Sequence, residues 1–119
     1  MKQVMNCHKD NGLLNMIRRT DPMINEDFGM TDQLADYIDS GRIQLFVVDS
    51  MDRESWSCKD GIPEWRAARQ EQYYRYIVDE AIPLIRSRNP EIPAVTGFSM
   101  GANHAVITFL RSPQLFRGV

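Results

Sequence analysis

The chain has 119 residues and a formal net charge of −2, with 43% of its residues hydrophobic and 25% charged. These fractions are typical of an ordinary globular protein, and the length allows a single domain over residues 1–119. Charges of both signs are interspersed without a basic stripe, which argues against nucleic-acid binding. No apolar run approaches the roughly 20 residues that cross a bilayer, and no apolar signal-peptide region is visible. We therefore expect a cytoplasmic protein with neither a membrane partner nor a nucleic-acid partner.

The two cysteines, Cys7 and Cys58, are far apart and lack the CxxC spacing of redox and metal-binding motifs. We expect free thiols, with a disulfide between them as the alternative. The two histidines, His8 and His104, do not cluster with these cysteines along the sequence. The sequence therefore predicts no metal site and no cofactor.

The first part of the chain carries weak secondary-structure signals. Residues 3–7 predict a short strand, although Asn6 suits a strand poorly. Residues 8–12 are expected to form a loop with an Asn-Gly turn signal. The apolar side chains of residues 13–17 predict a short helix that ends before Pro22.

The middle of the chain predicts a helix and then the clearest strand. Thr31 is a candidate N-cap for a helix to about Ser40, and Gly41 follows at a position that favours a left-handed residue. Residues 43–49 are apolar nearly throughout, which is typical of a central parallel strand covered on both faces. A loop over residues 50–62 follows.

A long helix is predicted to begin at Pro63, because proline suits the first helical position, and to run to about Arg88. Pro83 is expected to kink this helix or to end its regular part, because proline lacks the N–H that a helix needs. The apolar residues that predict the buried face recur at a spacing of three to four and are Trp65, Ala68, Tyr73, Tyr76, Ile77, Ala81, Leu84 and Ile85.

The strongest signal is Gly97-Phe98-Ser99-Met100-Gly101, between a β-prone run over residues 94–96 and a helix-prone run over residues 102–110. A strand, a tight turn and a helix form the context in which Gly-x-Ser-x-Gly indicates a nucleophile elbow. In that geometry the serine has a strained backbone with positive φ, and the two glycines prevent side chains from colliding. Ser99 Oγ would be the nucleophile, and the Met100 N–H would stabilise an oxyanion. The alternative is a glycine-rich turn with an incidental serine.

The helix after this turn is predicted to end at Pro113, and residues 117–119 are expected to begin another strand. Alternating strand and helix signals imply an α/β fold with a parallel sheet, of which about three strands are visible. The residues expected on the buried face of the last helix are Ala102, Ala105, Val106, Phe109 and Leu110.

The stretch Gly97-Phe98-Ser99-Met100-Gly101-Ala102 resembles the nucleophile region of the esterase D-like family of the α/β-hydrolases. Further stretches that are similar to this family are residues 27–30, 44–50, 54–56, 104–105 and 111–119. The resemblance implies a three-layer α/β-hydrolase sheet of about eight strands. We therefore expect an incomplete sheet of about three strands with flanking helices, that is, a single partial α/β-hydrolase domain.

In α/β-hydrolases the catalytic triad follows the chain order Ser, then Asp or Glu, then His. After Ser99 this chain has no acid, and its one histidine is His104. His104 is expected to point away from the elbow and to pack near the sheet, with a role as general base as the alternative. His8 is the other candidate base and would be a departure from the family. We expect the acid and the base of the triad to be absent from this chain.

Several other residues are candidates for supporting roles. Asp49, at the end of the predicted strand 43–49, is expected to accept hydrogen bonds from loop amides, with triad acid as the alternative. The acids expected to be solvated are Asp52, Asp60 and Glu64.

The oxyanion hole needs a second donor from an early loop, and the N–H of His8 or of Lys9 is expected by position. Trp56 is a candidate substrate contact, with core packing or anchoring of its loop as the alternative.

The resemblance implies a serine esterase that acts on a small-molecule ester through an acyl-serine, or the nucleophile-bearing fragment of one. Without a base and an acid, the isolated chain is expected to be inactive or weakly active. A complementing chain or a homo-oligomer would complete the sheet. The alternative is a non-catalytic assembly module that retains a truncated hydrolase fold.

Overall fold

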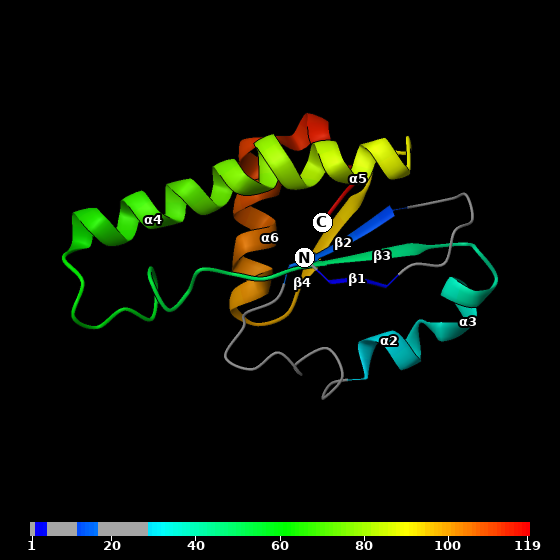
Figure 1. Cartoon of the computed structure of the whole chain (residues 1–119), viewed down its shortest axis with the longest axis horizontal. Helices are drawn as coiled ribbons and strands as arrows, with labels where there is room; N and C mark the ends of the chain where they lie inside the picture. Colours follow the sequence, from blue (N-terminus) through cyan, green and yellow to red (C-terminus); the bar gives the residue numbers. More distant parts are fainter. Residues whose placement is uncertain (1, 5–11, 17–28) are drawn as a thin grey trace.

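The computed structural model describes residues 2–4, 12–16 and 29–119. Figure 1 shows the strands in the middle of the molecule, with α4 and α5 along one side and α2 and α3 on the other. The elements in chain order are β1 (Lys2–Val4), β2 (Gly12–Met16), α2 (Met30–Gln33), α3 (Ala35–Asp39), β3 (Gln44–Val48), α4 (Pro63–Tyr76), the π-helical segment η1 (Ile77–Ala81), α5 (Ile82–Arg88), β4 (Ala94–Gly97), α6 (Met100–Arg111) and the short 3-10 helix η2 (Pro113–Leu115).

The described strands form one sheet in the order β1-β3-β2-β4. β2 lies between β3 and β4 and is parallel to both, whereas β1 pairs with β3 in antiparallel orientation. The α/β class is as expected. The expected count of about three strands and the expected purely parallel sheet are both wrong, since a fourth strand is present and β1 reverses direction.

The strand β2 corrects the helix that we expected over residues 13–17. Leu13 pairs with Leu45 on one side and with Ala94 on the other, so the strand occupies the centre of the described sheet. A five-residue helix is marginal by itself, because few hydrogen bonds offset the cost of nucleation. Two neighbouring parallel strands offer this segment a ladder on each side, and tertiary pairing therefore overrides the local signal. The expected first strand is found only at Lys2–Val4, and residues 5–7 lie outside the described residues.

Alternation along β3 divides the core between the two faces of the sheet. Phe46 and Val48 lie two residues apart on the face that packs against α4, η1, α5 and α6. Leu45 points to the opposite face and is fully buried, and Ile38 of α3 is 5% exposed. The prediction of a strand covered on both faces is confirmed.

The long helix begins at Pro63, as predicted, and continues to Arg88 with one irregularity. Ile77–Ala81 is π-helical and directly precedes the turn that contains Pro83. Pro83 cannot donate a hydrogen bond to the carbonyl four residues earlier, and its ring crowds that carbonyl. The wider π-helical turn accommodates the proline. On the predicted buried face, Trp65, Ala68 and Leu84 are exposed instead.

The helix predicted from Thr31 to Ser40 is divided into α2 and α3, with Leu34 between them. Gly29, with φ 62°, occupies the N-cap position that we predicted for Thr31. Gly41 has φ 72°, so the left-handed residue predicted after the helix is present.

The buried face of α6 differs from the one that we predicted. The buried residues are Gly101, His104, Ala105 and Thr108. Val106 and Leu110, which we expected to be buried, are 42% and 71% exposed. The polar His104 takes a place on the inner face because it finds hydrogen-bond partners there, which a helical-wheel count of apolar residues cannot anticipate.

The end of the chain returns to the sheet. Arg117 donates its backbone N–H to Pro93 O at 2.8 Å, and Val95 donates to Gly118 O at 2.9 Å. These two bonds place residues 117 and 118 beside β4, although no regular strand is formed there. None of the helices in the described part of the chain combines the length and the apolar composition of a membrane span.

Candidate active site

The turn between β4 and α6 holds Ser99 in an unusual backbone conformation. Its φ is 55° and its ψ is −121°, and it is the one non-glycine residue in the described ranges with positive φ. A residue with a side chain adopts this region at a cost of roughly 1–3 kcal/mol, so surrounding structure must impose it. Ser99 is exposed, and within the described residues its hydroxyl accepts no capping hydrogen bond from the backbone N–H groups of α6. The predicted positive φ at residue 99 is confirmed.

Gly97 allows the turn to be this tight. A Cβ at Gly97 would overlap the backbone carbonyl carbon and oxygen of Gly101 and would lie 2.6 Å from Ala102 N. Backbone atoms at such a distance cannot move aside as a flexible side chain can. The strand therefore runs directly into the helix only because residue 97 has no side chain.

The helix begins immediately after Ser99. The first N–H groups of a helix have no intrahelical acceptor, and the helix dipole adds a partial positive charge there. Met100 is the first residue of α6, so its N–H belongs to this set. An exposed hydroxyl thus lies next to backbone donors suited to a negatively charged oxygen.

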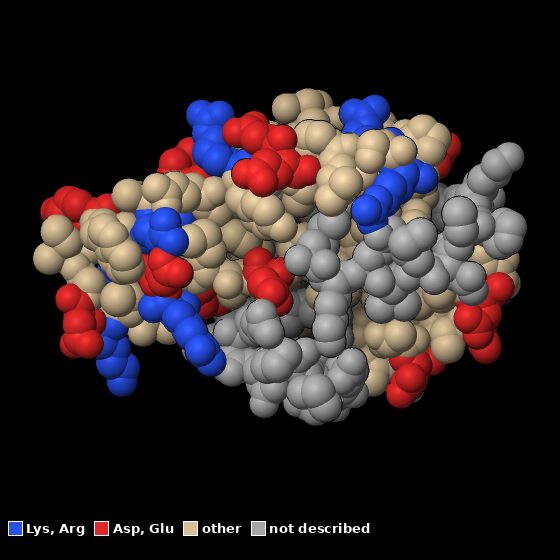
Figure 2. Space-filling view, in the orientation of Figure 1, with Lys and Arg blue, Asp and Glu red and all other residues tan. Residues whose placement is uncertain are grey.

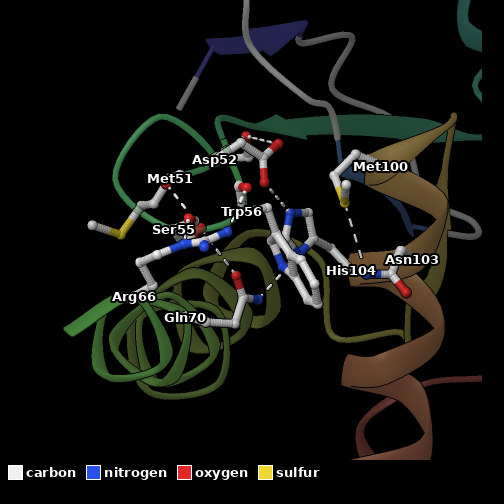
Figure 3. A network of polar contacts seen from close by, with 10 residues as sticks. Met51, Asp52, Ser55, Trp56, Arg66, Gln70, Met100, Asn103 and His104 are labelled. Atoms are coloured by element: carbon white, nitrogen blue, oxygen red, sulfur yellow. Dashed lines mark hydrogen bonds and ion pairs between the residues drawn. The ribbon is translucent and has the colours of Figure 1, made fainter. Parts of the chain in front are cut away.

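A second polar site is buried one helical turn further along α6 (Figure 3). His104 Nε2 lies 2.8 Å from Asp52 Oδ1, and both side chains are 1% exposed. Asp52 Oδ2 accepts a hydrogen bond of 2.7 Å from the Ser50 hydroxyl. The expectation that Asp52 is solvated is therefore wrong: the loop after β3 folds inward, and its carboxylate finds an imidazole as partner.

The other nitrogen of the His104 ring also has a partner. Gln70 Nε2 lies 3.1 Å from Nδ1, and Gln70 Oε1 accepts a hydrogen bond of 3.3 Å from the Ser55 hydroxyl. An amide NH₂ can only donate, so Nδ1 is the acceptor and Nε2 carries the proton that goes to Asp52. Both ring nitrogens thus have a partner, and the single proton of the Ser55 hydroxyl is shared between Gln70 Oε1 and Met51 O, which lies 3.0 Å away.

Tyr73 packs against the same ring. Its own ring meets that of His104 edge-on, with centroids 5.1 Å apart. Burial, and secondly the nearby Asp52, raise the pKa of Tyr73 far above its ordinary value. Its buried hydroxyl has no hydrogen-bond partner among the described residues.

These contacts bear on the possible role of His104 as a base. A general base must present a free nitrogen within about 2.6–3.2 Å of the proton that it abstracts. Both nitrogens of His104 are already bonded to other side chains, and the ring is buried. The geometry therefore supports the expected packing role over the base role.

The loop after β3 is fixed to α4 at two further points. Arg66 donates from Nε to Ser55 O and from a terminal nitrogen to Trp56 O, both at 2.8 Å. Trp56 is 47% exposed, which excludes core packing, whereas anchoring of its loop and contact with a substrate both stay predictions. It borders a hollow of about 350 Å³ whose lining residues are Ser55, Trp56, Pro63, Arg66, Ala67, Gln70 and Glu71.

The remaining candidates are only partly placed. His8 and Lys9, predicted to supply the second oxyanion donor, and Cys7 lie outside the described residues. Asp49, Asp60 and Glu64 are exposed, and Cys58 is a free thiol. Within the described ranges, no group of His, Cys, Asp or Glu side chains could hold a metal ion. The contacts that sequence reasoning missed are those of Gln70 and Ser55, because nothing local in the sequence marks a glutamine as the partner of a distant histidine.

Charged side chains are mixed over the surface. On the face shown in Figure 2, Lys and Arg lie among Asp and Glu without forming a continuous basic area. Several are paired, as Arg111 is with Glu71 at 2.8 Å. The hydrogen bond from Arg111 lowers the pKa of Glu71. The predicted absence of a nucleic-acid partner stays a prediction.

Comparison with known proteins supplies the family. No curated protein and no solved structure gives a significant match. The family model described as "Putative esterase" matches residues 8–119, which is most of the chain. The strand, turn and helix around Ser99 lie within the matched range, and the resemblance drawn from the sequence is confirmed: the chain belongs to this esterase family.

Proposed function

We propose that this chain carries the nucleophile of a serine esterase and that Ser99 is that nucleophile. The observation that carries the proposal is the backbone of Ser99, strained to φ 55° and exposed at the point where β4 ends and α6 begins. A protein retains such strain where function needs it. Membership of the esterase family supports an ester as the substrate class.

The first half of the reaction would form an acyl-serine. Ser99 Oγ loses its proton to a base, forms a bond to the ester carbonyl carbon and yields a tetrahedral oxyanion. The Met100 N–H is placed to donate to this oxygen, with the positive end of the α6 dipole behind it. The ester C–O bond then breaks, and the alcohol leaves with a proton. In the second half, water attacks the carbonyl carbon of the acyl-serine and gives its proton to the base. The bond to Ser99 Oγ then breaks, Oγ takes back a proton, and the carboxylic acid is released.

The base and the acid are proposed to come from outside the described residues. Both nitrogens of His104 are engaged, and the acids Asp49 and Asp52 lie in the loop after β3 rather than in the order that the family uses. His8 is the alternative base that the sequence suggested, and a complementing chain would supply both the acid and the base. Catalysis without a base would retain only the oxyanion and binding contributions, about 10³–10⁴ over water.

The test is covalent labelling of the chain with a fluorophosphonate, followed by mass mapping of the adduct. We expect slow labelling of Ser99 that accelerates as the pH rises, because hydroxide must do the work of the missing base. Ser99→Ala should abolish the adduct. Rapid stoichiometric labelling at neutral pH would contradict the absence of a base, and an adduct elsewhere would contradict Ser99 as the nucleophile.

A second candidate is the non-catalytic assembly module, and one observation favours it. Apolar side chains around the turn and on the outer face of α6 are exposed, at Phe98, Val106 and Leu110. Apolar surface of this kind is often covered by a partner. A stable oligomer in sedimentation, together with an unreactive Ser99, would favour this function over the esterase.

A further inference from the structure

The buried Asp52–His104 bond joins two segments that the fold could have left independent. Asp52 belongs to the loop after β3, and His104 belongs to α6, whose first residue follows Ser99. Figure 3 shows the imidazole between this loop and α6, with Gln70 reaching it from α4. Three segments therefore meet at one ring.

Stability alone is a poor explanation for this arrangement. Two polar groups taken from water lose hydration, and an apolar contact of similar volume often stabilises a core at least as well. Hydrogen bonds differ from apolar contacts in being directional, with narrow ranges of distance and angle. A fully satisfied buried network therefore specifies one relative placement of the segments that it joins.

The segment whose placement this network specifies is the first turn of α6. Met100 and His104 are four residues apart, so they lie on the same face of the helix in successive turns. Helical side chains lean toward the N-terminus of their helix, so the imidazole is expected on the Met100 side of the His104 Cα. Its two bonds, at 2.8 Å to Asp52 and 3.1 Å to Gln70, oppose rotation of this turn about the helix axis.

We infer that His104 is a positioning residue for Ser99: its bonds to Asp52 and Gln70 hold the start of α6 so that the Met100 N–H and the Ser99 hydroxyl face one opening. This inference rests on the proposed function of Ser99. His104 touches no reacting atom and is not a catalytic residue. Asp52 and Gln70 act through it.

The experiment compares matched variants of the chain. Asp52→Ala removes the acceptor for His104, whereas Asp52→Asn keeps an acceptor oxygen of the same reach. Gln70→Ala removes only the second bond and is the variant to use if Asp52→Ala does not fold. Ile85→Val, in the core on α5, lowers stability without touching the network and serves as the control.

Two quantities are measured on each variant. The first is the set of backbone amide NMR shifts and hydrogen-exchange rates at Met100 and Gly101. The second is the rate of fluorophosphonate labelling of Ser99 at alkaline pH. We expect Asp52→Ala to shift these amides, speed their exchange and slow labelling about tenfold, because small displacements of reacting groups are costly. Gln70→Ala should do the same to a smaller extent.

Asp52→Asn and Ile85→Val distinguish a positioning role of His104 from a general loss of stability. Asp52→Asn should keep the amide shifts and label within about threefold of the unaltered chain. Ile85→Val should lower the unfolding temperature without moving either quantity. Equal effects of Asp52→Ala and Ile85→Val, or unchanged amides in Asp52→Ala, would overturn the inference.

Failure of the proposed function has a different signature. If the unaltered chain never labels at Ser99 at any pH, the esterase proposal fails and the role of His104 in positioning Ser99 fails with it. The amide shifts would still report whether His104 orients the first turn of α6.

Discussion

Ser99 and His104 lie five residues apart on one stretch of chain, in opposite surroundings. Ser99 is exposed, and its geometry is set by the backbone of contiguous residues. His104 is 1% exposed, and its geometry is set by side chains from two other segments, one of them 52 residues away. One site is therefore fixed by local conformation and the other by tertiary packing. The two kinds of site should respond differently to substitution.

The largest effect is expected at the turn itself. Gly97→Ala places a Cβ onto the backbone of Gly101, which cannot move without displacing α6. We expect the free energy of unfolding to fall by at least about 3 kcal/mol, as measured by urea denaturation.

Gly118→Ala is the matched control, because nothing lies within 4 Å of a Cβ built there. A Gly97→Ala protein as stable as the Gly118→Ala protein would show that β4 does not run into α6 as described.

The next effect is expected in the buried cluster. Asp52→Ala leaves the His104 N–H and the Ser50 hydroxyl without their acceptor. An unpaired buried donor costs about 1–3 kcal/mol, so the free energy of unfolding should fall by about 2–3 kcal/mol. Asp52→Asn should recover most of this loss, since the amide oxygen still accepts. Equal losses in the two variants would mean that the hydrogen bond does not hold the loop.

A gain in stability is expected at Ser99. Ser99→Gly removes the Cβ that makes positive φ costly and should raise the free energy of unfolding by about 1 kcal/mol, while Ser99 labelling is lost. Thermal unfolding measures the change, and Ser112→Gly, at a residue with φ −141°, is the control that should not gain stability. A less stable Ser99→Gly protein would argue that the serine side chain supports the turn.

The smallest effect is expected at an exposed ion pair. Glu71→Gln should change the free energy of unfolding by less than about 0.5 kcal/mol, because the Glu71–Arg111 pair is solvated. Arg111 lowers the pKa of Glu71 in the folded state, so the small contribution is present above the unfolded pKa and is lost as the pH falls. Stability curves of both proteins at neutral and acidic pH measure it. A difference that grows on acidification would contradict this sign.

The same contrast separates what the sequence could predict from what it could not. The turn at Ser99, the helix start at Pro63 and the strand over residues 44–48 depend on neighbouring residues, and all were predicted. The strand at Gly12–Met16 depends on two partners far along the chain, whereas its local sequence signal predicts a helix. The sequence predicts Asp52 to be a solvated loop acid, because a sequence does not show which distant side chain a carboxylate will contact. In both cases the structure is determined by contacts between residues far apart in the sequence.

The central claim is that the strained serine between β4 and α6 is the nucleophile, and its labelling by a fluorophosphonate tests this most directly. We predict a single adduct, mapped to Ser99, whose rate of formation rises steadily with pH and which Ser99→Ala abolishes. A chain that remains unmodified at every pH, or that carries the adduct on another residue, would contradict the account.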